Sequence, residues 1–160
     1  MPHLPSDSGA IRLAIDLVQR ETVRPGDPAP VRLLATAAVE WLDQRDREWW
    51  PFVRLPPLWI EEEAAAALAG GIRELFQGGE PGFAWQAGAS FGLQLGLAEG
   101  GAVVIEIGVD LGAFLADASG LPPRAGGEAA LFRFTSAPAD VVRFAGAVET
   151  QLQELAELAR

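Results

Sequence analysis

The side chains that most often carry covalent or metal chemistry are nearly absent from this sequence. It contains no cysteine and one histidine, His3, and all 12 basic residues are arginines. A thiolate nucleophile, a Schiff-base lysine, a disulfide and a cysteine-ligated metal are therefore excluded. A Ser-His-Asp triad or a zinc site would have to recruit His3 from the very start of the chain. We predict no catalytic residue, no metal site and no cofactor, and hence a protein that is not an enzyme.

Carboxylates are the remaining candidates for chemistry. Glu61, Glu62 and Glu63 are consecutive in a predicted first helical turn. Successive helix residues point about 100° apart, so three neighbours do not converge on one ion. They complement the positive end of the helix dipole instead, and as a group they can contribute to a negative interaction surface.

A second acidic set comprises Glu106, Asp110 and Asp117. The sequence has no D-x-D-x-D-G loop for calcium, and nothing in it positions a carboxylate pair of the glycosidase kind. Ser90 lies outside any G-x-S-x-G motif, and no glycine-rich stretch has the spacing of a phosphate-binding loop. We therefore interpret Ser90 and the paired glycines as structural.

Five tryptophans give a different kind of candidate. We expect most of them to lie in the core, but Trp49 and Trp50 are adjacent, so in a strand they point to opposite faces. One of this pair is then partly exposed on an edge strand. An exposed tryptophan beside an acidic surface is a good binding anchor, and a simple packing role is the alternative.

Composition restricts the partners. The 160 residues are 49% apolar and carry a net charge of −10, of which −9 falls after residue 54. DNA, RNA and anionic membranes each need a positive counter-surface, so we predict no nucleic-acid and no membrane partner. The absence of lysine, asparagine and tyrosine is typical of a GC-rich bacterial genome. No secretion signal or spanning segment is evident, which predicts a cytoplasmic protein.

The elements that would position these residues begin with three strands. Residues 10–19 alternate in polarity, as a half-buried strand does. Residues 31–42 fit either a strand or a helix face, and we favour the strand. A charged tip at 43–48 leads to a strand at 49–55, placed on an edge because Pro51 cannot donate to a ladder.

Two helices follow at about 61–77 and about 137–159. The first contains Gly70 and Gly71, which indicate either a close packing contact or a break. The second is predicted to be capped by Thr135 or Ser136. Between the helices lie further strands at 83–86, 91–98, 102–109 and 130–135, with a hairpin turn at Glu99.

This order predicts an α+β fold. It has a mainly antiparallel sheet of about six strands, covered by the central helix and the C-terminal amphipathic helix. The chain of 160 residues forms a single domain, residues 1–160, in which residues 1–9 are expected to be flexible.

The pattern of elements from about residue 10 to 158 resembles a known family. The segments that carry the resemblance are Glu40-Trp41-Leu42, the helix Glu61 to Gln77, Phe91-Gly92-Leu93-Gln94-Leu95, Val103-Val104-Ile105-Glu106-Ile107 and Leu131 to Phe134, before the C-terminal helix. In this order they are similar to the WapI-type immunity proteins of bacterial polymorphic toxin systems. The resemblance implies a non-catalytic protein that binds and blocks a cognate toxin domain.

An acidic surface suits such a role, because it speeds encounter with a basic toxin domain and competes for the site that would hold phosphate. The predicted partner-binding residues are Trp49, Trp50, Glu61, Glu62, Glu63, Glu99, Asp110 and Asp117. The alternative is a structural or regulatory domain that self-associates as a homo-oligomer through strand faces made of small residues. A third hypothesis, an enzyme that uses carboxylates, would need a buried acid pair in a pocket. The competing interpretation of the acidity itself is that it only solvates the surface.

Overall fold

The computed structural model describes residues 1–21, 29–55, 57–78, 81–88, 90–110 and 129–159. Within them the chain forms nine strands and two long helices. The fold is α+β, as predicted, and its strand pairs are antiparallel. The prediction of a single sheet of about six strands was wrong, because the strands divide into two sheets.

The first sheet is centred on one long strand. Its members are β1 (His3–Pro5), β2 (Ile11–Arg20), β3 (Arg32–Leu42), β4 (Trp49–Arg54) and β5 (Leu58–Glu61). β3 pairs with β2 along one side and with β4 and then β5 along the other. Pro57 lies between β4 and β5, where it cannot donate a ladder hydrogen bond.

Alternation of apolar residues explains how β2 and β3 are oriented. Leu13, Ile15 and Leu17 of β2 are buried, and so are Leu33, Ala35, Ala37 and Val39 of β3. The register pairs Leu13 with Val39 and Leu17 with Ala35, so these residues share one face. The strand interpretation of residues 31–42 is confirmed, and the helix alternative is wrong.

The second sheet contains β6 (Gly82–Ala87), β7 (Phe91–Leu97), β8 (Val103–Asp110) and β9 (Ala129–Ser136) in that spatial order. One face of each strand is apolar and buried, with Leu93, Ile105 and Phe134 among the largest side chains. The turn between β7 and β8 places Gly100 and Gly101 at φ of 95° and 86°, a conformation that favours glycine.

Helix α1 (Glu62–Phe76) packs closely against the second sheet at a glycine, where the helix has no side chain. A Cβ at Gly71 would lie 1.9 Å from the ring of Phe83, whereas a Cβ at Gly70 would meet no atom within 4 Å. Close packing therefore explains Gly71, and the helix does not break there. Nothing in the structure explains Gly70.

Helix α3 (Pro138–Leu158) begins with Pro138, close to the predicted start at about residue 137. The predicted caps were wrong, because Thr135 and Ser136 lie in β9 and the N-cap is Ala137, which has no side-chain hydrogen bond. The strand extends to Ser136 because that residue pairs with Val103 of β8.

Two short strands were not predicted. Residues 1–9, for which the sequence predicted flexibility, contain β1, and its Leu4 is fully buried opposite Leu13 of β2. β5 was interpreted as the approach to the helix. Three or four residues are too few to display a period, so long-range pairing alone defines these strands.

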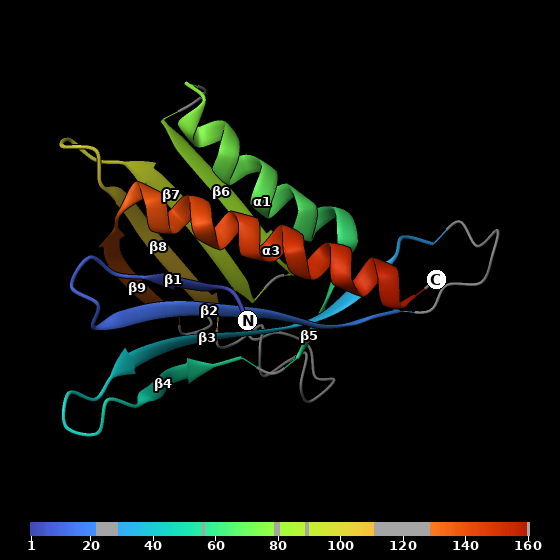
Figure 1. The fold of residues 1–160 in the computed structure, drawn as a ribbon, viewed down its shortest axis with the longest axis horizontal. Coiled ribbons are helices and arrows are strands. Elements are labelled where there is room, and N and C mark those ends of the chain that lie inside the picture. The colour runs from blue at the N-terminus through green and yellow to red at the C-terminus, as the bar shows by residue number, and fades with distance from the viewer. Residues whose placement is uncertain (22–28, 56, 79–80, 89, 111–128, 160) are drawn as a thin grey trace.

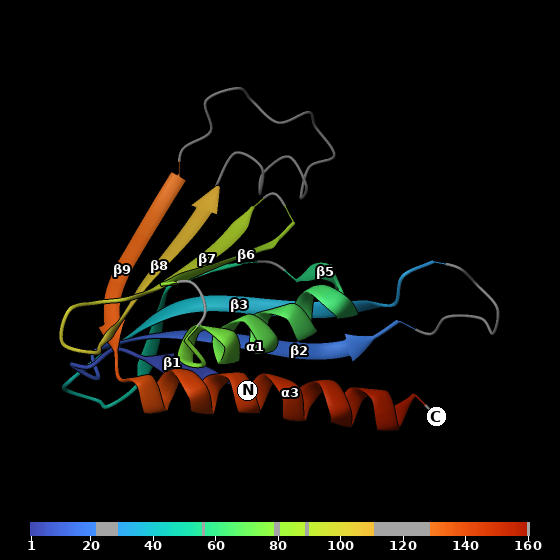
Figure 2. The ribbon, with the colours of Figure 1, turned by 90° about the horizontal axis from the view of Figure 1, so that it is seen from above.

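The two helices lie side by side and cover one side of the molecule, as Figures 1 and 2 show. Buried side chains from both sheets and both helices form one continuous core, with Leu13, Leu33, Leu68, Ile72, Leu93, Ile105 and Phe144 among its members. No helix in the described residues is both long enough and apolar enough to cross a membrane.

Candidate functional site

The tryptophans lie mostly at the surface, contrary to the prediction that most would be in the core. Trp85 is buried and donates its indole N–H to the carbonyl oxygen of Ala64 at 2.7 Å. Trp41, Trp50 and Trp59 are 37%, 49% and 46% exposed. Their position explains this exposure. Strands β4 and β5 form one edge of the first sheet, Trp50 and Trp59 lie on these strands, and Trp41 lies on β3 opposite Trp50.

The adjacent pair divides as predicted into one packed and one exposed ring. Trp49 is half-buried beneath the guanidinium of Arg12, which lies 4.1 Å from its ring centroid. The same guanidinium pairs with Glu40 at 2.7 Å, and Glu40 is opposite Arg12 in the register. Trp50 is the exposed member. It projects from the face opposite to that of Trp49, and it is the cross-strand partner of Trp41.

A bulge in β4 adds a third exposed ring. The register between β3 and β4 shifts at Val39 and Glu40, and the extra residue on β4 is Phe52, which is 56% exposed. Its ring centroid lies 6.1 Å from that of Trp41 and 6.2 Å from that of Phe132 on β9. Phe52 therefore connects the free edge of the first sheet with the free edge of the second.

The rings of Trp41 and Phe52 border a crevice of about 680 Å³, which we call the hairpin crevice. It is lined by Ala10, Ile11, Trp41, Leu42, Asp43, Gln44, Arg45 and Phe52. Its walls are apolar and its rim is the charged β3–β4 loop. This composition, with aromatic rings and an arginine at the surface, is typical of the residues that anchor protein interfaces.

The predicted acidic residues are not brought together with the tryptophan pair. Glu61 ends β5, Glu62 and Glu63 begin α1, and Glu99 lies in the β7–β8 turn. Figure 1 shows the start of α1, the β7–β8 turn and the β3–β4 loop at three separate places on the molecule. Glu62 is also paired with Arg20 at 2.9 Å, while Glu61, Glu63 and Glu99 are exposed.

Asp110 and Glu106 share the outer face of β8, and Asp117 lies outside the described residues. Positions four apart in a strand are separated by roughly 13 Å, which is farther than the carboxylate pairs of glycosidases. Glu106 moreover pairs with Arg133 of β9 at 3.3 Å. In the described residues no group of three or more His, Cys, Asp or Glu side chains is arranged to hold a metal ion.

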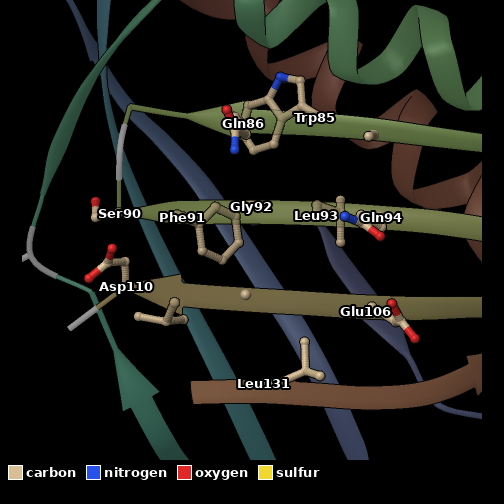
Figure 3. Close-up of a pocket in the computed structure, with 13 residues that line it drawn as sticks. Trp85, Gln86, Ser90, Phe91, Gly92, Leu93, Gln94, Glu106, Asp110 and Leu131 are labelled. Atoms are coloured by element: carbon tan, nitrogen blue, oxygen red, sulfur yellow. The ribbon is translucent and has the colours of Figure 1, made fainter. Parts of the chain in front are cut away.

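A second hollow, which we call the glycine trough, lies on the outer face of the second sheet. It measures about 570 Å³, and Gly92 and Gly108, which are register partners, form its floor. Figure 3 shows Gln86 and Gln94 along it and Ser90 beside Asp110 at one end. Asp110 donates its backbone N–H to the carbonyl oxygen of Ser90 at 2.9 Å.

The chemistry available in the glycine trough is limited to hydrogen bonding and charge. Ser90 is 1% exposed, and its hydroxyl has no hydrogen-bond partner in the described part of the chain, so no base activates it. Exposed amides of Gln86 and Gln94 and the carboxylate of Glu106 remain. The small-residue face expected from the sequence is thus present, with Gly92 and Gly96 half-exposed.

Sequence reasoning missed Trp41 and Phe52. Trp41 continues the alternation of β3 and so resembles a core residue, but it lies one step beyond the covered part of the sheet. Phe52 directly follows Pro51, and a proline in an edge strand is a signal for a bulge. Pro51 therefore indicates both an edge strand and a bulge, and the prediction included only the edge strand.

Comparison with known proteins gives little beyond the fold. No protein-family model matches the sequence, and no curated protein matches it either. Among solved structures, the chain is similar to the plant transcriptional regulator PBF-2, with a TM-score of 0.53 and 8% sequence identity. The match covers 99% of this chain and 83% of that one. At this identity the likeness shows that the two chains share a fold.

Proposed function

We propose that this chain is a cytoplasmic, non-catalytic binding protein of the immunity type, which neutralises a cognate toxin domain. The observation that carries the proposal is the hairpin crevice, where Trp41 and Phe52 expose aromatic surface at a sheet edge, with Trp50 exposed opposite Trp41 in the register. Large exposed aromatic clusters on a monomer mark protein-binding surfaces. The order of elements that resembles WapI-type immunity proteins supports the more specific role.

The charge of the molecule supports a basic partner. Net charge is −10, and acidic residues such as Glu61, Glu63 and Glu99 are exposed at separate places. A negative field attracts a positively charged protein from every direction of approach. The role named for PBF-2 belongs to that protein, because 8% identity conveys only a fold, and the net charge of this chain repels nucleic-acid phosphates.

The test is a growth assay with the product of the adjacent upstream gene. We expect that product to arrest growth when expressed alone and to be neutralised when this chain is co-expressed. Trp41→Ala should raise the dissociation constant about 30-fold, the effect of removing an interface anchor. Trp59→Ala is the matched control, since Trp59 is also an exposed tryptophan of the first sheet but, unlike Trp41, does not line the crevice.

Two results would contradict the proposal. One is a neighbouring gene product that does not arrest growth and does not bind this chain. The other is equal neutralisation by the wild type and by a Trp41→Ala, Trp50→Ala double variant whose fold is intact by circular dichroism.

The glycine trough supports self-association as a second candidate. Gly92 and Gly108 leave the outer face of the second sheet bare along the trough, and a second copy could cover it. A Cβ at Gly108 would meet no atom within 4 Å, so Gly108→Arg places a charge in the trough without a clash. If the chain self-associates through this face, light scattering should show an oligomer that Gly108→Arg dissociates. A wild-type monomer at high concentration would exclude it.

A further inference from the structure

The arginines of this acidic chain are distributed unevenly between paired and unpaired positions. Six of them form ion pairs within the fold, namely Arg12, Arg20, Arg32, Arg73, Arg133 and Arg143. The other three in the described residues, Arg45, Arg47 and Arg54, form no ion pair there. All three belong to the β3–β4 hairpin, beside the exposed aromatic rings.

Arg45 is the unpaired arginine that lines the hairpin crevice. Its backbone N–H donates to Oδ1 of Asp43 at 2.8 Å, so this carboxylate already has a partner. The guanidinium of Arg45 has no acceptor within the described chain and is exposed. The crevice therefore combines apolar walls, formed by Ile11, Trp41 and Phe52, with the guanidinium N–H donors of Arg45 at its rim.

The edge of β4 is poorly suited to strand addition. Pro51 removes one backbone donor, and the bulge at Phe52 twists the strand away from a regular ladder. A partner that approaches this edge therefore gains more from side-chain contacts than from backbone pairing.

We infer that the hairpin crevice takes one large apolar side chain of the partner protein, with a neighbouring partner carboxylate paired to Arg45. The inference rests on the proposed function and names the chemistry of its anchor. The scattered acidic surface and the hairpin crevice then have different tasks. Scattered acidic residues attract a basic partner, and the crevice recognises a local acidic and apolar feature on it, which rejects partners that place a cation there.

Aromatic rings beside arginines would also suit a single-stranded nucleic acid. The charges around the crevice favour a protein instead, because Asp46 and Glu48 are exposed between and beside Arg45 and Arg47. Mixed charge of this kind offers no continuous positive track for phosphates.

The experiment uses two small probes, N-acetylphenylalanine and its uncharged amide, titrated into the full ¹⁵N-labelled chain. The five indole N–H signals are assigned from Trp→Phe variants. We expect both probes to shift the signal of Trp41 and to leave that of buried Trp85 unchanged. The carboxylate probe should bind about threefold more tightly than the amide, a modest gain because the ion pair is solvent-exposed.

Arg45→Gln should equalise the two affinities by weakening the carboxylate probe alone. Arg143→Gln is the matched control, since it removes an exposed arginine of α3 that does not line the crevice, and it should leave the threefold preference intact. Well-dispersed spectra of both variants show that they are folded.

Three outcomes would overturn the inference. They are the absence of a Trp41 shift with about 20 mM of either probe, equal affinities for both probes in the wild type, and a stronger Trp41 shift with an eight-residue oligothymidylate, which would assign the crevice to nucleic acid. The growth assay is independent of this titration. Failure there with a positive titration would remove the inhibitor role and leave the crevice chemistry standing.

Discussion

A missing β-carbon at position 71 allows α1 to approach the ring of Phe83. Gly71→Ala should destabilise the chain by about 1–3 kcal/mol, since the added methyl group would displace that ring. Gly70→Ala should stabilise it by about 0.5–1 kcal/mol, because alanine favours the helix and meets no neighbour. Urea unfolding of the two variants measures both effects. A similar shift in both would mean that helix propensity outweighs the contact.

The single histidine gives a residue-scale prediction on pH. Burial, the guanidinium of Arg12 and the N-terminal amino group together lower the pKa of His3 below its ordinary value of 6.5, against a smaller opposing effect of Glu40 and Asp16. The unfolded chain then binds this proton more readily, so stability is full above pH 6.5 and falls as the pH drops through the window below it.

Replacement of His3 removes this dependence. Between pH 7.5 and 5.5, the urea midpoint of His3→Gln should fall less than that of the wild type. Parallel curves for the two proteins would show that β1 does not favour the neutral imidazole.

At the scale of elements, one polar side chain of α3 forms hydrogen bonds to the first sheet, in addition to the apolar packing of the helix. Gln151 accepts a hydrogen bond from the backbone N–H of Leu17 at 3.2 Å and donates to Oδ1 of Asp16 at 2.5 Å. Gln151→Ala should cost about 1–2 kcal/mol, since it leaves a partly buried backbone donor without its partner. Gln153→Ala, two positions along the same helix and exposed, should change the unfolding free energy little. Equal effects of both would argue against this role.

Elements whose hydrophobic pattern continues over many residues were predictable from the sequence, and elements defined only by strand pairing were not. β2, β3 and α3 each display their alternation or their three- and four-residue steps over ten or more residues. The division into two sheets depends on which strands pair, and periodicity does not contain that information. Exposure of one member of the Trp49–Trp50 pair was predicted from adjacency, whereas the crevice needs Trp41 and Phe52 from two strands, which only the folded chain brings together.

At the scale of the whole molecule, the acidity is distributed. Glu61 and Glu63 lie at the start of α1, and Glu154 and Glu157 lie near the end of α3, all of them exposed. Substitution of either pair by glutamine should lower the association rate with a basic partner by the same factor of about two at low salt. The effect should vanish at about 0.5 M salt, where the Debye length is only a few ångströms. A much larger effect of one pair, measured by stopped flow, would reveal a focused acidic surface instead.

The ring of Phe52 has a mechanical consequence for the two sheets. It contacts Trp41 of the first sheet and Phe132 of the second, so a ligand seated on it restrains both edges at once. Occupation of the crevice should therefore slow hydrogen–deuterium exchange in β9, although none of the residues that line the crevice belongs to that strand. Partner binding at this hairpin would then also hold the two sheets together, and the bound form of this chain would open locally less often than the free form.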